Sequence, residues 1–221
     1  MGKRMDLIEE AKSFLTMYIK GKSSNGEKSY PWRNDWKFVI RHSIRVESFA
    51  KEIMSKENSL SDKDKLMISM ASILHDIGTF DDKKNHAKVG SDIVKNWCTN
   101  KDFIEKNVDT KKLITLIANH SKKEGKEKDS HLAILKDADI LDEIGAMSIV
   151  KNIYDSNAKN DAYFNEVMEK LEKEEIPMIQ KKRDKLTTKT AKVMLDKKIK
   201  FIKDFINELK SELMGTDGLN F

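Results

Sequence analysis

Proline is scarce in this chain, and its scarcity limits what the chain can fold into. Only Pro31 and Pro177 occur among 221 residues, and the segments around them are rich in Lys, Glu, Leu, Met, Ile and Ala. These residue types favour helix. Apolar residues recur with helical spacing, as at Val39, Val46 and Ala50, whereas no segment alternates polar and apolar residues for long enough to predict a strand. The sequence therefore predicts an all-α protein.

Turn-rich and polar segments divide this predicted all-α chain. We expect helices over about residues 5–20, 35–56, 61–76, 86–97, 110–121, 131–154, 161–175 and 187–213. Residues 1–34 would hold the first helix and a loop, and residues 35–155 the core. Residues 156–213 would form C-terminal helices that complete the same domain, before a tail at residues 214–221.

The charge of the chain is high in content but nearly balanced in sign. Charged residues make up 36% of the chain, and the net charge is +5. This balance is compatible with an anionic ligand, while no motif typical of nucleic-acid binding occurs. No apolar segment reaches the roughly 18 residues of a membrane span, and the single cysteine, Cys98, excludes an intrachain disulfide. We therefore expect a cytoplasmic protein without membrane or nucleic-acid partners.

Three histidines lie on the apolar faces of separate predicted helices. His42 follows Val39 by three residues, and His75 and His120 each follow apolar residues by four and by seven. A single inward-facing histidine is usually a hydrogen-bonded core residue. Three of them, together with the Asp76 that directly follows His75, indicate instead a shared site, because a metal ion stabilises buried imidazoles and carboxylates.

A second acidic cluster lies in an apolar segment near residue 140. Asp137, Asp139, Asp142 and Glu143 fall within about two helical turns. One interpretation is a negatively charged helix start with capping aspartates. The other is a carboxylate that binds a ligand, because Asp139 lies in the most apolar part of the segment.

The segments around these residues resemble those of the HD-domain phosphohydrolase superfamily. His42 stands in "RHSIRV", His75 and Asp76 stand in "ASILHDIG", and Asp139 stands in "DADILDEIGA". In this order they are similar to the H…HD…D signature, and over about residues 35–212 the chain is similar to the small stand-alone bacterial and archaeal members. The resemblance implies an HD-domain helical bundle with the C-terminal helices packed on it.

The resemblance also implies a metal site. Its ligands would be His42, His75, Asp76 and Asp139, and Asp76 would also take part in catalysis. Mixed imidazole and carboxylate ligands suit Mn²⁺, Fe²⁺, Co²⁺, Ni²⁺ or Zn²⁺ better than Mg²⁺.

His120 and a further histidine, His86, lie outside this ligand set and are similar in placement to the extra histidines of binuclear members of the superfamily. They would bind a second metal ion or, alternatively, hydrogen-bond the substrate phosphate. Asp137 or Asp142 is expected to orient a ligand histidine, and His131 is expected at the surface or in a helix cap.

Basic residues beside these histidines are candidates for substrate binding. Arg45 lies three residues after His42 and would contact a phosphate; a salt bridge to an acidic neighbour is the alternative. Lys122 and Lys123, which follow His120 closely, would attract an anionic substrate.

The resemblance implies a metal-dependent phosphohydrolase that acts on a phosphate ester or anhydride. The small stand-alone members suggest a nucleotide as substrate, cleaved as a pyrophosphohydrolase or a phosphomonoesterase would. The alternative function is a non-catalytic HD-fold regulator or ligand-binding scaffold. The sequence leaves open whether the chain forms a homodimer.

Overall fold

The computed structural model describes residues 7–25, 30–57, 59–99, 101–122 and 127–215. Within these ranges the chain is helical and no strand forms, apart from an isolated bridge between Ser23 and Asp35. The predicted all-α class is confirmed. None of the described helices combines the length and the apolar character that crossing a membrane requires. The chain divides into two compact units, residues 1–142 and 143–221; the domain boundaries expected from the sequence stay predictions.

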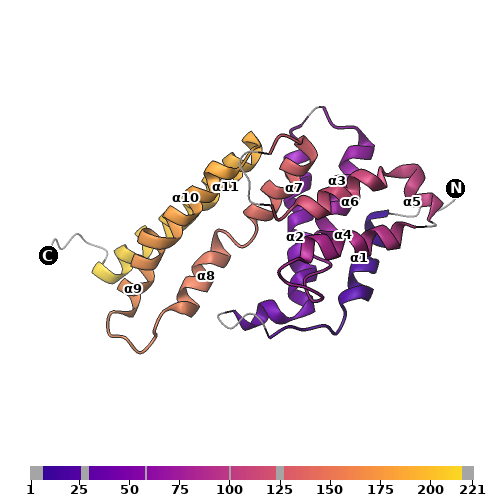
Figure 1. The fold of residues 1–221 in the computed structure, drawn as a ribbon. Coiled ribbons are helices and arrows are strands. Elements are labelled where there is room, and N and C mark those ends of the chain that lie inside the picture. Colours follow the sequence, from indigo (N-terminus) through magenta and orange to yellow (C-terminus); the bar gives the residue numbers. More distant parts are fainter. Residues whose placement is uncertain (1–6, 26–29, 58, 100, 123–126, 216–221) are drawn as a thin grey trace. The chain divides into compact units, whose positions relative to one another are not determined.

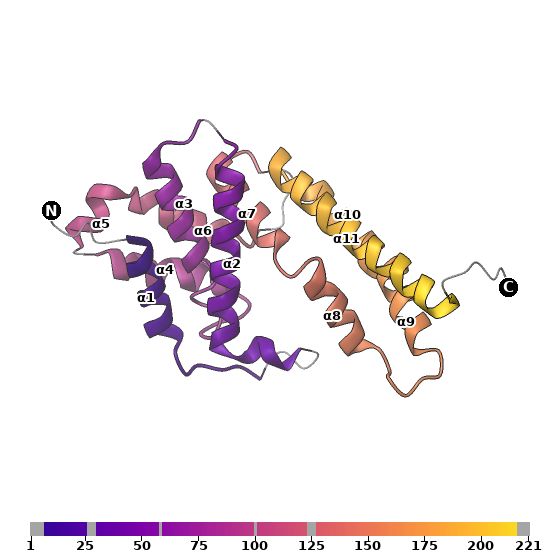
Figure 2. The ribbon, with the colours of Figure 1, turned by 180° about the vertical axis from the view of Figure 1, so that it is seen from behind.

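The described part of the first unit is a bundle of helices (Figure 1). In chain order, its elements are α1 (Leu7–Ile19), the 3₁₀ turn η1 (Pro31–Asn34), α2 (Trp36–Met54), α3 (Asp62–Leu74), α4 (His86–Cys98), α5 (Asp102–Asn107), α6 (Thr110–Asn119) and α7 (Ser130–Leu141). Helix α2 packs against α3 and α7, and α4 packs against α6. From behind, α1 is seen beside α3, against which it packs (Figure 2).

The core of this bundle is made by apolar residues from the helix faces that meet. Val46, Ile68, Leu116 and Leu135 come from α2, α3, α6 and α7, and each is at most 1% exposed. Burial of such side chains contributes about 1.5–3 kcal/mol each. These contacts hold together the helices that carry the predicted metal ligands.

Capping residues define where the site helices begin. The Ser61 hydroxyl accepts a hydrogen bond from the Asp64 backbone N–H, and the Asp64 carboxylate accepts one from the Ser61 backbone N–H, so that α3 starts with a capping box. Asp109 and Asp129 cap α6 and α7 in the same manner, through backbone N–H groups of the first turn.

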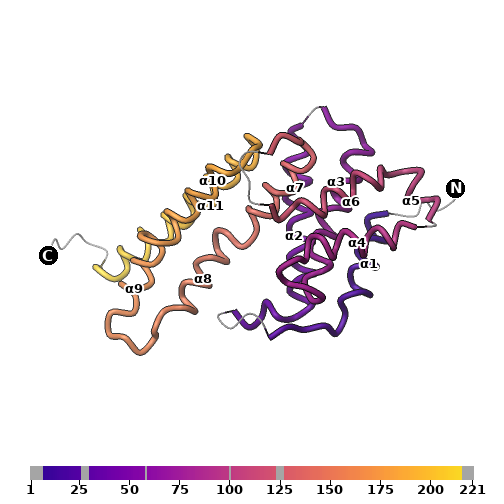
Figure 3. Tube along the Cα trace, viewed as in Figure 1, coloured from indigo at the N-terminus to yellow at the C-terminus, as the bar shows by residue number. Residues whose placement is uncertain are grey.

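The second unit consists of α8 (Ala146–Asp155), α9 (Tyr163–Glu169), the π-helical segment η2 (Lys170–Glu175), α10 (Ile176–Lys185) and α11 (Lys189–Met214). The elements from α9 to α10 follow one another without a break, and α11 runs back alongside α10 in the opposite direction (Figure 3). Leu171, Ile179 and Ile202 are fully buried within this unit.

Several helix boundaries differ from the sequence-based expectation. The segment over residues 131–154, expected as one helix with room for a kink, is two helices, because Asp142 is extended and Glu143 and Gly145 have positive φ angles of 57° and 96°. The helix expected to end at residue 175 continues to Lys185. A wide π turn precedes Pro177, which lies in the first turn of α10, where its missing N–H costs little. Helix α5 was not predicted, because six residues give no readable periodicity.

Candidate metal centre

Six side chains from the first unit converge at the ends and inner faces of five helices. His42 lies on α2, His75 and Asp76 follow α3, His86 begins α4, His120 follows α6, and Asp139 lies near the end of α7. Five of the helices therefore supply them, although the first and last of these residues lie about a hundred positions apart. All six are residues that the sequence predicts for the site.

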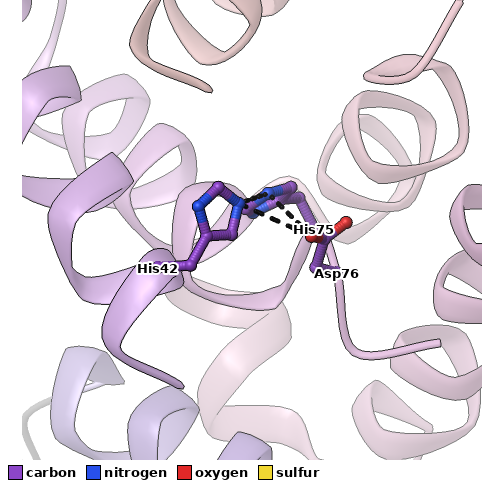
Figure 4. Close-up of side chains that lie close together, drawn as sticks. All are labelled: His42, His75 and Asp76. Atoms are coloured by element: carbon purple, nitrogen blue, oxygen red, sulfur yellow. Dashed lines mark hydrogen bonds and ion pairs between the residues drawn. The ribbon is translucent and has the colours of Figure 1, made fainter. Parts of the chain in front are cut away.

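The first group brings together the four predicted ligands of one ion. His42 Nε2 lies 3.1 Å from His75 Nε2, 3.5 Å from Asp76 Oδ2 and 3.4 Å from Asp139 Oδ1. His75 Nε2 lies 3.6 Å from Asp76 Oδ2 and 3.7 Å from Asp139 Oδ1. Figure 4 shows His42, His75 and Asp76 pointing toward one another.

These spacings fit a metal ion better than a network of direct hydrogen bonds. Bonds of about 2.1 Å from an ion to nitrogen or oxygen ligands place neighbouring tetrahedral ligands about 3.4 Å apart. The contacts to Asp76 and Asp139 lie at 3.4–3.7 Å, which is longer than a good N–H···O hydrogen bond. His42, His75 and Asp76 therefore form a donor set that suits a divalent ion, and Asp139 lies within 3.7 Å of both imidazoles, as a fourth ligand would.

The second group uses the other oxygen of Asp76. Asp76 Oδ1 lies 3.4 Å from His86 Nε2 and 3.4 Å from His120 Nε2, and these two nitrogens lie 3.2 Å apart. The three atoms thus form a triangle with edges like those of the first group. Asp76 is the residue that the two groups share.

Each of the four imidazoles is oriented by a hydrogen-bond partner of its Nδ1 atom, the ring nitrogen that faces away from the centre of the cluster. Nδ1 of His75, His86 and His120 lies 2.8, 3.0 and 2.7 Å from a backbone carbonyl oxygen three residues earlier. Nδ1 of His42 instead lies 2.7 Å from Asp142 Oδ2. Because a carbonyl or carboxylate oxygen requires a donor, each Nδ1 carries a proton, and in the neutral form of each ring the Nε2 lone pair faces the centre of the cluster.

Burial and charge act in opposite directions on the pKa values in the first group. Burial lowers the pKa of His75. Burial also opposes protonation of His42, but the nearby carboxylates of Asp139, Asp142 and Asp76 outweigh it and raise the pKa of His42 to about 10. Burial opposes ionisation of Asp76, yet the surrounding imidazoles of His75, His120 and His42 hold the pKa of this carboxyl well below its usual range. The site thus keeps its carboxylates ionised and attracts positive charge.

The remaining predicted residues have different surroundings. Arg45 donates two hydrogen bonds to Asp142, from Nε to Oδ1 at 2.6 Å and from Nη2 to Oδ2 at 2.9 Å, as the salt-bridge alternative expects. Asp137 is buried on α7. Lys122 is exposed after α6, and Lys123 lies outside the described residues. Their roles toward a substrate stay predictions.

His131, expected at the surface or in a cap, is the second residue of α7, in the turn that Asp129 caps. Its Nδ1 lies 3.5 Å from Asp129 Oδ1, and its Nε2 lies 3.3 Å from Asp64 Oδ1 on α3. It therefore lies apart from both groups of the metal centre.

Two glycines that the sequence reasoning did not single out bring α4 close to the turn after Asp76. A Cβ atom on Gly78 would lie 2.5 Å from the His86 carbonyl oxygen and 2.6 Å from the Gly90 backbone nitrogen. Only glycine permits this approach of two backbones. Gly78, the glycine that ends "HDIG", could have indicated this contact from the sequence, since a glycine just after a buried helix can mark a close approach of two backbones.

The segment that carries the six converging residues matches a known protein family. Residues 39–144 match the family model described as HD domain. The matched segment begins on α2, just before His42, and ends after Asp142, so it contains all six converging residues. No curated protein matches the chain.

Solved bacterial structures resemble the chain along nearly its whole length. The Lin1889 protein of Listeria innocua is 25% identical, with 97% of this chain and 98% of that chain covered and a TM-score of 0.57. A predicted HD superfamily hydrolase from an uncultured Thermotogales bacterium is 19% identical, with 93% and 92% covered and a TM-score of 0.57. Bacillus subtilis YpgQ in complex with ADP is 18% identical, with 95% and 100% covered and a TM-score of 0.54.

Proposed function

We propose that this chain, which belongs to the HD-domain superfamily of metal-dependent hydrolases, hydrolyses a phosphate ester or anhydride of a nucleotide. The observation that carries the proposal is the position of Asp76, whose two carboxylate oxygens each face a separate group of metal-compatible side chains. A carboxylate shared in this way suits two ions that act on one phosphate.

The first group would hold one divalent ion through His42, His75, Asp76 and Asp139. When bound, such an ion lowers the pKa of water and neutralises charge on phosphoryl oxygens. Nitrogen ligands favour Mn²⁺, Fe²⁺, Co²⁺, Ni²⁺ or Zn²⁺ over Mg²⁺. The chain itself contributes preorganisation, because each imidazole is already turned by its own Nδ1 hydrogen bond.

His86 and His120 would hold a second ion together with Asp76. The edges of 3.2–3.4 Å among the three donor atoms support this role over direct hydrogen bonding of a phosphate. The His86 side chain is 23% exposed and that of His120 is 2% exposed. Asp139, at 34%, and Asp76, at 22%, are the other well-exposed side chains of the two groups, so a substrate would approach over Asp139, Asp76 and His86.

A nucleotide is supported as the substrate by two features. Lys83 and Lys84 precede His86, and Lys122 follows His120; all three are exposed and supply positive charge on the second group's side. The similar YpgQ of Bacillus subtilis was solved in complex with ADP. Release of phosphate would indicate a phosphomonoesterase, and release of pyrophosphate would indicate a pyrophosphohydrolase.

A metal-by-nucleotide screen tests this function. Metal-free protein is supplied with Mn²⁺, Co²⁺, Ni²⁺, Zn²⁺ or Mg²⁺ and with each nucleoside mono-, di- and triphosphate, and phosphate and pyrophosphate are detected separately. We expect turnover that requires a transition metal and is lost in Asp76→Asn. Nucleotide binding without turnover under every metal would contradict the enzyme and favour the non-catalytic regulator.

A further inference from the structure

The four imidazoles of the metal centre differ in the partner that holds their Nδ1 nitrogen. His75, His86 and His120 direct Nδ1 to the backbone carbonyl oxygen three residues earlier, at 2.7–3.0 Å, within the local turn that leads to each ring. Any fold that forms these turns orients these rings. His42 has no such support: its Nδ1 lies 2.7 Å from Asp142, a residue 100 positions later in the sequence. The orientation of His42 therefore depends on where the Asp142 carboxylate is held.

Arg45 holds that carboxylate. The Asp142 side chain is 3% exposed, and Arg45 donates to both of its oxygens. Oδ2 accepts from Arg45 Nη2 and lies 2.7 Å from His42 Nδ1, so the two contacts meet at one atom. Two parallel hydrogen bonds from a planar guanidinium fix both the place and the plane of a carboxylate, which a single contact does not.

Asp142 is also hydrogen-bonded to Asp139, the predicted metal ligand on α7. The Asp142 backbone N–H donates to the Asp139 carbonyl oxygen at 3.2 Å, in the turn that ends α7. Arg45 and His42 lie three residues apart on α2, which packs against α7. The ion pair thus joins the helix that carries His42 to the helix end that carries Asp139.

We propose that Arg45 is a positioning residue for the first ion: by holding Asp142 in a two-point contact, it fixes His42 relative to Asp139. This inference rests on the proposed function, because it requires an ion in the first group. The second group contains no residue that depends on Asp142. Arg45 therefore supports metal affinity in the first group and has no effect on affinity in the second.

The experiment measures Mn²⁺ affinity of metal-free protein by calorimetric titration in two backgrounds. His86→Ala leaves the first group intact, and His42→Ala leaves the second. We expect Arg45→Gln to weaken Mn²⁺ binding about 10–100-fold in the His86→Ala background, and by less than about twofold in the His42→Ala background. Arg41→Gln, at an exposed arginine one turn earlier on α2, is the matched control and should leave both affinities unchanged.

A second variant separates weaker metal binding from a loss of the folded state. Arg45→Lys keeps a positive charge beside the buried carboxylate but lacks the planar fork, so it should fold, as circular dichroism will show, and bind Mn²⁺ more weakly than Arg45 does. An unchanged affinity in Arg45→Lys and Arg45→Gln, or an equal loss in both backgrounds, would overturn the inference. Absence of Mn²⁺ binding by the wild-type chain would instead contradict the proposed function, and with it this inference.

Discussion

Replacing Gly78 with alanine would place a methyl group between two backbones that nearly touch. The added Cβ would lie 2.5 Å from the His86 carbonyl oxygen and 2.6 Å from the Gly90 nitrogen, where ordinary contacts begin at 3.4 Å. Backbone atoms cannot turn away as a flexible side chain can. The turn after Asp76 and the start of α4 must therefore separate by about 0.9 Å to accept the methyl group.

That separation has a cost in stability and in the geometry of the second group. Overpacking of this kind typically costs about 1–3 kcal/mol, and a chain of this size loses about 2–4 °C in Tm per kcal/mol. His86 is the first residue of α4, so its Nε2 would move from its place 3.2 Å from His120 Nε2 and 3.4 Å from Asp76 Oδ1. A shift near 1 Å at a reacting centre reduces turnover about 100-fold.

The assay compares Gly78→Ala with Gly90→Ala, which adds a methyl group to the opposite side of the same contact. On Gly90 the Cβ would lie 3.3 Å from the Ile77 Cγ2 atom, a side-chain contact only about 0.1 Å closer than an ordinary one, and alanine favours helix over glycine by about 0.5–1 kcal/mol. Thermal unfolding should show a lower Tm for Gly78→Ala and an unchanged or higher Tm for Gly90→Ala. Wild-type stability and turnover in Gly78→Ala would show that the two backbones can separate without cost, contrary to this prediction.

Four further outcomes follow from the structure. Asp76→Asn should lose more than about 100-fold in nucleotide hydrolysis, because it weakens both groups, with the helical circular dichroism spectrum retained; turnover near wild type would reject its role. Metal at about 100 times its Kd should raise the stability of the metal-free chain by about 2.7 kcal/mol, seen as a higher Tm, and an unchanged Tm would count against binding to the folded chain. Burial raises the pKa of the Cys98 thiol to about 11, so iodoacetamide at pH 8 should label it at least about 100-fold more slowly than an unfolded control and faster as pH rises toward that value; equal rates would contradict its burial. Ser61→Ala removes one half of the capping box of α3 and should cost about 1 kcal/mol in denaturant unfolding, whereas no loss would show that the cap is not formed.

The sequence carried enough information to predict which residues meet, because helical spacing shows which side chains face inward. His42, His75 and His120 each continue an apolar stripe on their own helix. Asp139 lies in the most apolar part of its segment, which also indicates a position facing the interior. His86 is different: it begins its helix, continues no stripe, and was found through the family resemblance alone. Periodicity says which face of a helix is buried, but says little about a residue in its first turn.

The pairing of Arg45 with Asp142 was beyond local reasoning. Spacing correctly places Arg45 on nearly the same face of α2 as His42, but its partner is 97 residues away. Asp142 reaches it because α7 ends at Leu141 and the chain turns through Glu143, whose φ angle is positive. Glutamate gives no sequence signal for that conformation, which non-glycine residues seldom adopt. The break between α7 and α8, and with it this ion pair, was therefore visible only in three dimensions.

The amount of metal that the protein retains distinguishes a centre for two ions from a cluster held by hydrogen bonds alone. After reconstitution with Mn²⁺ and removal of free ion, elemental analysis should find two equivalents in the wild-type chain and one in each of His42→Ala and His86→Ala. Asp76→Asn should hold none, because its carboxylate is shared by both groups. A wild-type chain that retains no metal, or an Asp76→Asn variant that retains both equivalents, would contradict the account.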